Sequence, residues 1–216
     1  MISAVILAAG ESRRMGELKP LSRINGLTFM QHIEQALRRA GIEEIVAVVG
    51  FDADKIRRES GTQARFALNR YYAQGQFSSL QIGIRALPPC RGVVVCLADQ
   101  PQVRSAWIAA LVDAFNAQGG LIVRPCFGAK MGHPLLYSAE LFPHLLALPP
   151  SSSAKTVMEQ FAAQTTVVDI ASEAILHDAD TPDDLRLISR FFESASDQSG
   201  RQQLRASVHS RGEAML

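Results

Sequence analysis

The 216 residues carry a formal net charge of +1 at pH 7, and 47% of them are hydrophobic. A chain of this length can bury one sizeable core, and its even charge argues against general attraction to nucleic acid or to a membrane surface. The three cysteines form no C-x-x-C pair, which argues against a disulfide framework or a zinc ribbon. We therefore expect the ligand at one defined site.

Short β-branched runs alternate with helical patterns along the chain. The expected strands, several of them apolar on both faces, are 4–7, 45–49, 93–97, 121–123 and 166–170. Strands that are buried on both faces indicate a mostly parallel sheet covered by helices. The sequence thus predicts a three-layer α/β fold, with a mostly parallel central sheet and helices on both faces.

Helical spacing of apolar residues fills the segments between these strands. The first helix covers 29–40 and ends at Gly41, where a left-handed C-cap is expected. Further helices are expected over 105–115 and 153–161. Thr181 caps a last helix, which opens with a proline and two acids.

One domain is expected over residues 1–192, without internal repeats. From 193 to 216 the chain becomes polar and loses its apolar period, which predicts a mobile C-terminal tail with no assigned function. No apolar stretch approaches the length of a membrane span, and Met1 leads into a strand-like run without a basic leader. Together with the scarcity of cysteine, this predicts a cytoplasmic protein.

The stretch LAAGESRRMGELK, residues 7–19, leaves the first expected strand at its carboxyl end, where parallel sheets bind ligands. Residues 8–10 carry almost no side chain, so an anionic ligand can approach their backbone amides closely. Arg13, Arg14 and Lys19 can neutralise phosphate oxygens. The loop is neither a Walker loop nor a G-x-G-x-x-G site, yet it predicts a polyphosphate cradle. An ordinary strand-to-helix turn with solvated basic residues is the alternative.

Asp99 follows the apolar run 93–97 and is therefore expected at the same edge of the sheet. Burial of a carboxylate there is costly without a cation. Mg²⁺ held by one or two carboxylates and by phosphate oxygens is the usual counter-ion where two anions must meet. A role for Asp99 as a turn or cap residue is the alternative.

Taken whole, the first loop resembles the signature L-A-A-G-x-S-x-R-M-G-x-x-K of the MobA-like nucleotidyltransferases, most closely that of the molybdenum cofactor cytidylyltransferases. Further family motifs follow in order between residue 2 and about residue 192: N…G…S-S-L-x-x-G over 69–83, L-A-D-Q-P over 97–101, G-H-P over 132–134 and D-x-D-T-P over 178–182. The resemblance implies a Rossmann-like nucleotidyltransferase fold.

The resemblance also implies Mg²⁺-dependent transfer of CMP from CTP to the phosphate of the molybdenum-pterin cofactor, with release of pyrophosphate. Lys19 and Arg14 would stabilise the charge on the pyrophosphate, while Asp99 and Asp180 would hold the metal ion. Such a transfer needs positioning and charge stabilisation and no side-chain nucleophile. Asp178 would share a face with Asp180 in an extended segment, so the sequence does not separate the two.

The implied nucleotide contacts lie in the first loop and at two later positions: Leu7, Ala8, Ala9, Gly10, Ser12, Arg14, Gly16, Lys19, Asn69 and Ser79. For Asn69 and Ser79, local turn and cap hydrogen bonds are the alternative. Relatives that transfer CMP carry A-A-G where those that transfer GMP carry A-G-G, so Ala9 favours CTP. A single methyl group discriminates by only about 1 to 3 kcal/mol.

The implied contacts to the acceptor substrate are His133, Pro134 and Lys155. An attacking phosphate has already lost its proton at neutral pH, so a general base has little to remove. His133 is therefore expected either to contact the substrate or to be a structural histidine.

The chain departs from the family pattern in two segments. Lys130 and Met131 stand before Gly132 where the family has R-G-H-P, so a charged contact to the acceptor is displaced to Lys130 or missing. Residues 150–155, PSSSAK, replace a G-D-x-G-A-R segment, although a serine-rich helix start with one lysine still offers N–H groups and a cation to an anion.

Two other functions stay open at this point. An enzyme of the same fold that acts on a sugar or polyol phosphate would share the first loop and Asp99 and differ over 128–155. A non-catalytic nucleotide- or cofactor-binding protein would need no metal ligands, and the joint presence of Asp99 and Asp180 argues against it. In the favoured reading the partners are CTP, a molybdopterin-type cofactor, and a molybdenum hydroxylase or its chaperone.

Overall fold

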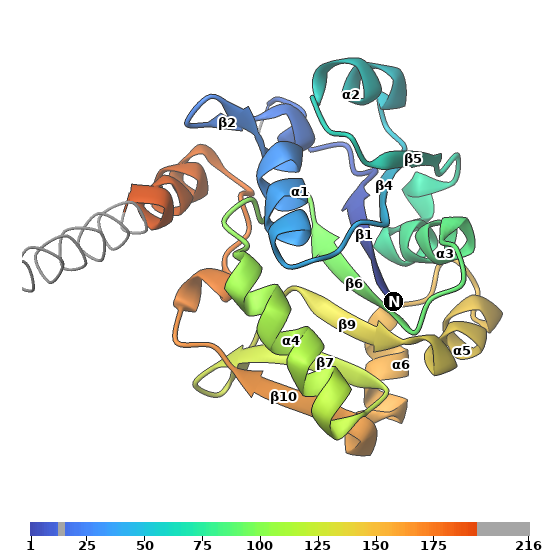
Figure 1. Ribbon diagram of the computed structural model, residues 1–216. Coiled ribbons are helices and arrows are strands. Elements are labelled where there is room, and N and C mark those ends of the chain that lie inside the picture. Colours follow the sequence, from blue (N-terminus) through green and yellow to red (C-terminus); the bar gives the residue numbers. More distant parts are fainter. Residues whose placement is uncertain (13–15, 194–216) are drawn as a thin grey trace, which may run out of the picture.

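The chain, described over residues 1–12 and 16–193 of a computed structural model, folds around one eight-stranded sheet (Figure 1). Seven strands follow the order β10-β7-β9-β6-β1-β4-β5, and β8 pairs with β7. Their bounds are β1 (Ile2–Ala8), β4 (Ile45–Val49), β5 (Arg65–Leu68), β6 (Gly92–Leu97), β7 (Ile122–Phe127), β8 (Lys130–Met131), β9 (Leu135–Ser138) and β10 (Thr165–Asp169). A separate hairpin pairs β2 (Arg23–Ile24) with β3 (Leu27–Thr28).

The centre of the sheet is parallel. β1 pairs parallel with both β4 and β6, so that Ile6 lies between Ala47 and Cys96. The β4–β5 and β7–β10 pairs are parallel as well. β9 runs antiparallel to both of its neighbours, β6 and β7. Every residue of β4 and β6 is buried, which agrees with strands that are apolar on both faces.

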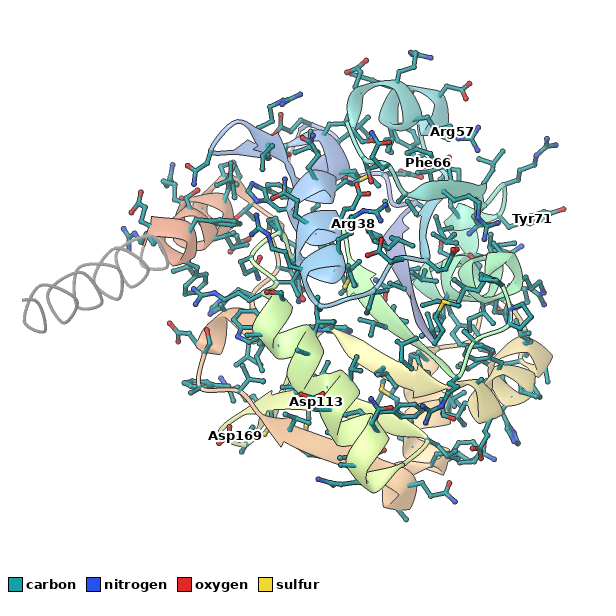
Figure 2. The ribbon with its side chains drawn as sticks, in the orientation of Figure 1. Arg38, Arg57, Phe66, Tyr71, Asp113 and Asp169 are labelled. Carbon is teal, nitrogen blue, oxygen red and sulfur yellow. The ribbon has the colours of Figure 1, made fainter. Side chains whose placement is uncertain are left out.

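Helices cover both faces of the sheet. Their bounds are α1 (Phe29–Arg39), α2 (Ala53–Glu59), α3 (Gln76–Ala86), α4 (Ser105–Gln118), α5 (Phe142–Ala147) and α6 (Ala154–Gln160), and a further helix covers 182–193. Apolar residues of α1 and α4 join one core cluster, and those of α3, α5 and α6 join the cluster on the opposite face. Polar side chains such as Asp113 on α4 point outward (Figure 2). The expected three-layer α/β fold is confirmed.

Local sequence signals fix several of the element ends. Thr28 and Gln31 form a capping box at the start of α1, and Gly41 follows its end with φ +81°. The last helix has a similar start, because the Thr181 hydroxyl accepts from the Asp184 N–H while the Asp184 carboxylate accepts from the Thr181 N–H.

The sequence interpretation missed several short elements. β9 has only four residues, all of them buried, so it shows no alternation of apolar and polar positions. β7 continues beyond Val123 through Arg124 and Pro125, which are unusual residues in an inner strand. α3 was not predicted either, because its serine pair and Gly83 lower the helix propensity of the segment.

The expected tail over 193–216 lies, apart from Glu193, outside the described residues, so the predicted boundary stays a prediction. None of the described helices combines the length and the apolar character that a membrane crossing requires.

Candidate functional site

The candidate site lies at the carboxyl edge of the parallel strands, where the exits of β1, β4 and β6 meet. The Ala98 N–H donates to the Leu7 carbonyl at 3.1 Å, which ties the exit of β6 to that of β1. The Phe51 N–H donates to the Ala9 carbonyl at 3.1 Å and ties in the exit of β4. The backbone of the first loop is thus fixed from both sides at the edge where parallel sheets bind ligands.

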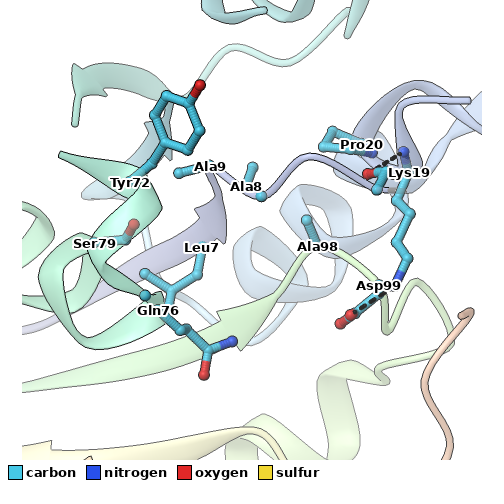
Figure 3. Close-up of a pocket in the computed structure, with 13 residues that line it drawn as sticks. Leu7, Ala8, Ala9, Lys19, Pro20, Tyr72, Gln76, Ser79, Ala98 and Asp99 are labelled. Atoms are coloured by element: carbon cyan, nitrogen blue, oxygen red, sulfur yellow. Dashed lines mark hydrogen bonds and ion pairs between the residues drawn. The ribbon is translucent and has the colours of Figure 1, made fainter. Parts of the chain in front are cut away.

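A cavity of about 260 Å³, which we call the loop cleft, opens at this edge (Figure 3). It is lined by Leu7, Ala8, Ala9, Gly10, Ser12, Lys19, Pro20, Tyr72, Gly75, Gln76, Ser79, Ala98 and Asp99. The lining includes most of the expected nucleotide contacts. Gly16 lines a neighbouring hollow instead, and Arg14 lies outside the described residues.

Lys19 joins the two carboxylates that were expected to hold a metal ion. Its Nζ lies 3.2 Å from Oδ2 of Asp99 and 2.5 Å from Oδ1 of Asp180. The lysine side chain is only 12% exposed and each acid side chain 26%. The Lys19 N–H also donates to the Ser12 hydroxyl at 3.0 Å, which fixes the end of the loop. Residues from three distant parts of the sequence therefore form one charged cluster.

Asp99 lies in an electrostatically unfavourable environment. Burial raises the pKa of its carboxyl; the Lys19 ammonium opposes that rise and the Asp178 charge adds to it. Its Oδ1 is buried and has no hydrogen-bond partner among the described residues. An unsatisfied buried carboxylate oxygen is costly, and a cation would relieve that cost.

Hard divalent cations such as Mg²⁺ and Mn²⁺ prefer oxygen ligands, and Asp99 and Asp180 present carboxylates to a shared position. Among the described residues no group of three or more His, Cys, Asp or Glu side chains could hold a metal ion alone. Two carboxylates fit a Mg²⁺ site of the kind that is completed by substrate phosphates and water.

Asp178 and Asp180, the two acids of the D-x-D-T-P segment, have different partners and different exposure. Oδ1 of Asp178 accepts from Gln100 Nε2 at 2.7 Å, and the Asp178 residue is exposed. Asp180 is partly buried and contacts Lys19. Between them, the Ala179 N–H donates to the Asp99 carbonyl at 2.8 Å and fastens the segment to the exit of β6. The geometry therefore places Asp180, and not Asp178, against the Lys19 ammonium.

Asn69 is fully buried beneath the loop cleft and makes local hydrogen bonds. Its Nδ2 donates to the hydroxyls of Ser78 and Ser79 at 2.8 and 3.0 Å, and its Oδ1 accepts from the Tyr71 N–H at 2.9 Å. It thereby holds the start of α3, from which Ser79 lines the loop cleft. Direct contact of Asn69 or Ser79 with a nucleotide stays a prediction.

A second cavity of about 270 Å³, which we call the side hollow, shares Leu7 and Gln76 with the loop cleft. Its lining also includes Phe77, Leu80, Val95, Leu97, His133, Leu135, Tyr137, Ser152, Ser153, Ala154, Lys155 and Met158. Two of the three expected acceptor contacts, His133 and Lys155, are among them, whereas Pro134 is buried behind a cis bond to His133. The Lys155 side chain is 76% exposed and lies 3.6 Å from Glu159.

The G-H-P segment is held by backbone hydrogen bonds to β7 and to the segment that follows β10. The Gly132 N–H donates to the Pro125 carbonyl at 2.9 Å and the His133 N–H to the Ile175 carbonyl at 3.1 Å. Burial first, and the charge of Arg124 second, lower the pKa of His133 to about 4. The imidazole is therefore neutral at pH 7 and only weakly basic.

Sequence reasoning missed Tyr72 and Gln76 in the loop cleft and Tyr137 in the side hollow. The sequence left open whether a charged contact is displaced to Lys130 or missing; Lys130 is exposed on β8 and is not among the residues that line the side hollow. No motif marked these positions; the short 3₁₀ helix Tyr72–Gln74, the start of α3 and the register of β9 bring them to the site.

The fold is of the kind seen in solved nucleotidyltransferase structures. Residues 4–166 match the MobA-like NTP transferase domain, and the chain belongs to this family.

Relatives with curated names agree with this class. The "Probable molybdenum cofactor guanylyltransferase" of Opitutus terrae is 30% identical over 129 residues, which are 59% of this chain and 62% of that protein. The "Bifunctional protein GlmU" of Geobacillus thermodenitrificans is 31% identical over 123 residues, 54% of this chain. The chain matches 26% of the length of that GlmU protein.

Solved structures share the fold over nearly the whole chain. A nucleotidyl transferase from a Methanothermobacter species superposes with a TM-score of 0.77 at 24% identity, covering 90% of this chain and 99% of that one. Rv0371C from Mycobacterium tuberculosis H37Rv, solved as a complex with manganese, has a TM-score of 0.69 at 25% identity and covers 88% of this chain and 98% of its own.

Proposed function

We propose that the protein transfers CMP from CTP to the phosphate of a molybdenum-pterin cofactor and releases pyrophosphate, with Mg²⁺ as the cofactor. The observation that carries this proposal is the Lys19–Asp99–Asp180 cluster beside the bare backbone of residues 8–10. Such an arrangement brings a cation, two carboxylates for a metal ion and a nearly bare backbone together in adjoining hollows at one edge of the sheet, where a triphosphate could bind.

Each group has a distinct task in this proposal. Asp99 and Asp180 would hold the metal ion, which neutralises phosphate charge when it is bound. The amides of residues 8–10 and the Lys19 ammonium bind the phosphates, and Arg14, which lies outside the described residues, adds a second cation to the departing pyrophosphate. The partly enclosed walls strengthen these electrostatic contacts by excluding water.

The choice of CTP rests on Ala9. Its side chain is 5% exposed and lines the loop cleft. A methyl group at this place narrows the space for a base edge, which favours the smaller pyrimidine by about 1 to 3 kcal/mol. The molybdenum relative is named as a guanylyltransferase, so Ala9→Gly is the informative variant. We expect it to raise the use of GTP relative to CTP by about tenfold.

The choice of a molybdenum-pterin acceptor is supported by the name of the Opitutus relative and by the side hollow next to the loop cleft. A sugar or polyol phosphate is the second candidate, because an enzyme that acts on one would share the first loop and Asp99 and differ over 128–155, where this chain departs from the family pattern. In the first case a molybdenum hydroxylase or its chaperone in the cytoplasm would receive the product.

The test measures pyrophosphate release from CTP, GTP and ATP in turn, each with Mg²⁺ and with either the phosphorylated pterin cofactor or a panel of sugar and polyol phosphates. We expect release from CTP with the pterin cofactor. Release that depends on a sugar or polyol phosphate, and not on the pterin, would overturn the proposed acceptor. Thermal unfolding with each nucleotide supplies an independent readout, since a ligand at 100 times its Kd adds about 2.7 kcal/mol of stability.

A further inference from the structure

Tyr137 carries a buried hydroxyl that the protein itself leaves unsatisfied. The residue is 1% exposed, lies on β9 and lines the side hollow. Its hydroxyl has no hydrogen-bond partner among the described residues. Buried tyrosine hydroxyls usually find a partner, and leaving one without costs about 1 to 3 kcal/mol. A phenylalanine would fill the same space without this cost, so the hydroxyl calls for an explanation.

A second unsatisfied donor lies on the same face of the sheet. β7 and β9 are antiparallel, with Ile122 opposite Tyr137 and Val123 opposite Leu136. Continued by one residue, this register sets Arg124 opposite Leu135 and on the side of the sheet that Tyr137 occupies. The Nε of Arg124 is buried and has no partner among the described residues.

The charge of Arg124 acts electrostatically on two residues that line the side hollow. It helps to lower the pKa of His133, and it opposes the rise in the pKa of Tyr137 to about 12 that burial causes. Arg124 therefore supplies, from the neighbouring strand, a cation near His133, where the family motif has an arginine and this chain has Met131. Met131 is 44% exposed on β8 and does not line the side hollow.

The walls of the side hollow indicate what kind of group these donors face. Phe77, Leu80, Leu97 and Met158 are among its apolar lining residues. A cavity with apolar walls and few polar groups suits a flat ring system with hydrogen-bond acceptors on its edge. A polyol would place some of its hydroxyls against the apolar part of this lining, where they find no partners.

We propose that Tyr137 and Arg124 recognise the hydrogen-bond acceptors of a planar heterocycle on the acceptor substrate, and thereby select this substrate class over sugar and polyol phosphates. The inference rests on the proposed function and adds two specificity-determining residues to it. The hydroxyl is covered by protein atoms, so binding of the heterocycle would move part of the lining of the side hollow. The unbranched Met158 side chain belongs to this lining and can change its conformation at little cost.

The test compares Tyr137→Phe with the wild-type enzyme in the presence of Mg²⁺ and CTP. We expect the KM for the pterin cofactor to rise by about tenfold, because the variant lacks one hydrogen-bond donor, while the KM for CTP stays unchanged. We expect the melting temperature to stay the same or to rise, since the unsatisfied hydroxyl is gone. Titration of pterin fluorescence should show the same loss of affinity without any turnover.

Two further variants complete this test. Tyr71→Phe is the matched control, because Tyr71 is 66% exposed and points away from the molecule (Figure 2); it should change neither constant. Arg124→Gln should also raise the KM for the pterin cofactor, and Arg124→Lys should restore part of the loss because it keeps the charge.

The outcomes separate this inference from the proposed function. If the wild-type protein neither binds nor modifies the pterin cofactor, the proposed function and the inference both fail. If it modifies the pterin and Tyr137→Phe leaves the KM for the pterin unchanged, the inference alone is wrong. A lower melting temperature of Tyr137→Phe with an unchanged KM would identify the hydroxyl as a purely structural group.

Discussion

The loop cleft and the side hollow have nearly the same volume, about 260 and about 270 Å³, but their polar groups are paired to different extents. In the loop cleft the Lys19 ammonium is paired with Asp99 and Asp180, and Oδ1 of Asp99 has no partner among the described residues. The Tyr137 hydroxyl in the side hollow and the Nε of Arg124, on the same face of the sheet, have no partner among the described residues either. A ligand that binds Lys19 would therefore have to displace existing ion pairs, whereas a ligand that binds Tyr137 would have no such pair to break.

The largest effect on activity should come from replacing Asp99, the acid at the exit of β6. Asp99→Asn keeps the shape of the side chain and removes its charge, so we expect pyrophosphate release to fall by about a thousandfold. Asp178→Asn is the matched control: Asp178 is exposed and accepts from Gln100, and its loss should change the rate by less than about threefold. Equal losses in the two variants would contradict the assignment of Asp180 over Asp178.

Lys19→Met should separate metal binding from catalysis in the loop cleft. In the wild-type protein the Lys19 ammonium contacts both carboxylates and competes with a metal ion for them. Without the ammonium the two carboxylates repel each other, and a bound metal ion relieves this repulsion. We therefore expect Mn²⁺ to bind about tenfold more tightly in the absence of nucleotide, by calorimetric titration. Pyrophosphate release should fall by about a hundredfold, because the phosphates lose a cation. Weaker Mn²⁺ binding by this variant would show that Lys19 supports the metal site directly.

The close packing of α3 against β1, beside both cavities, depends on Gly83. α3 supplies Ser79 to the loop cleft and Leu80 to the side hollow, and a Cβ on Gly83 would lie 2.6 Å from Cγ1 of Val5 on β1. Gly83→Ala should therefore lower the free energy of unfolding by about 2 kcal/mol, measured by urea denaturation. Gly10→Ala, with nothing within 4 Å of its Cβ, is the control and should leave stability unchanged. Equal stability of Gly83→Ala and wild type would mean that α3 can move away from β1.

The smallest expected effect is a change in the free energy of unfolding with pH, which arises from His133 in the side hollow. Because the pKa of His133 falls from 6.5 to about 4 on folding, the unfolded chain takes up a proton between these values and the folded protein does not. The stability present above pH 6.5 is thus lost as the pH falls toward 4. For this half-buried group we expect a loss of about 1 kcal/mol. Urea denaturation of His133→Gln over this range should show a shallower fall, and an identical slope would contradict the lowered pKa.

Much of the fold could be predicted from the sequence because its signals are local. The strand over 45–49 and the start of α4 at Ser105 match the structure, since apolar runs and the helical spacing of apolar residues depend on neighbouring residues alone. The first loop could be placed for the same reason, because a bare, basic stretch after a strand belongs to the carboxyl edge of the sheet.

The remaining parts of the site depend on contacts between distant segments. Asp178 and Asp180 look equivalent in sequence, and only the hydrogen bond from Gln100 to one and the ion pair of Lys19 with the other distinguish them. Arg124 was not singled out, because its position follows from the register of β7 against β9. Register between strands is not encoded in either strand alone.

The reversed direction of β9 determines where in the sequence the proposed acceptor-binding residues lie relative to their strand. A parallel strand brings its last residues to the ligand-binding edge, so Asp99 follows β6. β9 runs the other way, with Leu135 opposite Val95, and so its first residue is the one nearest that edge. The G-H-P segment accordingly precedes its strand. In proteins built this way, the residues worth mutating lie downstream of every forward strand and upstream of the one that turns back.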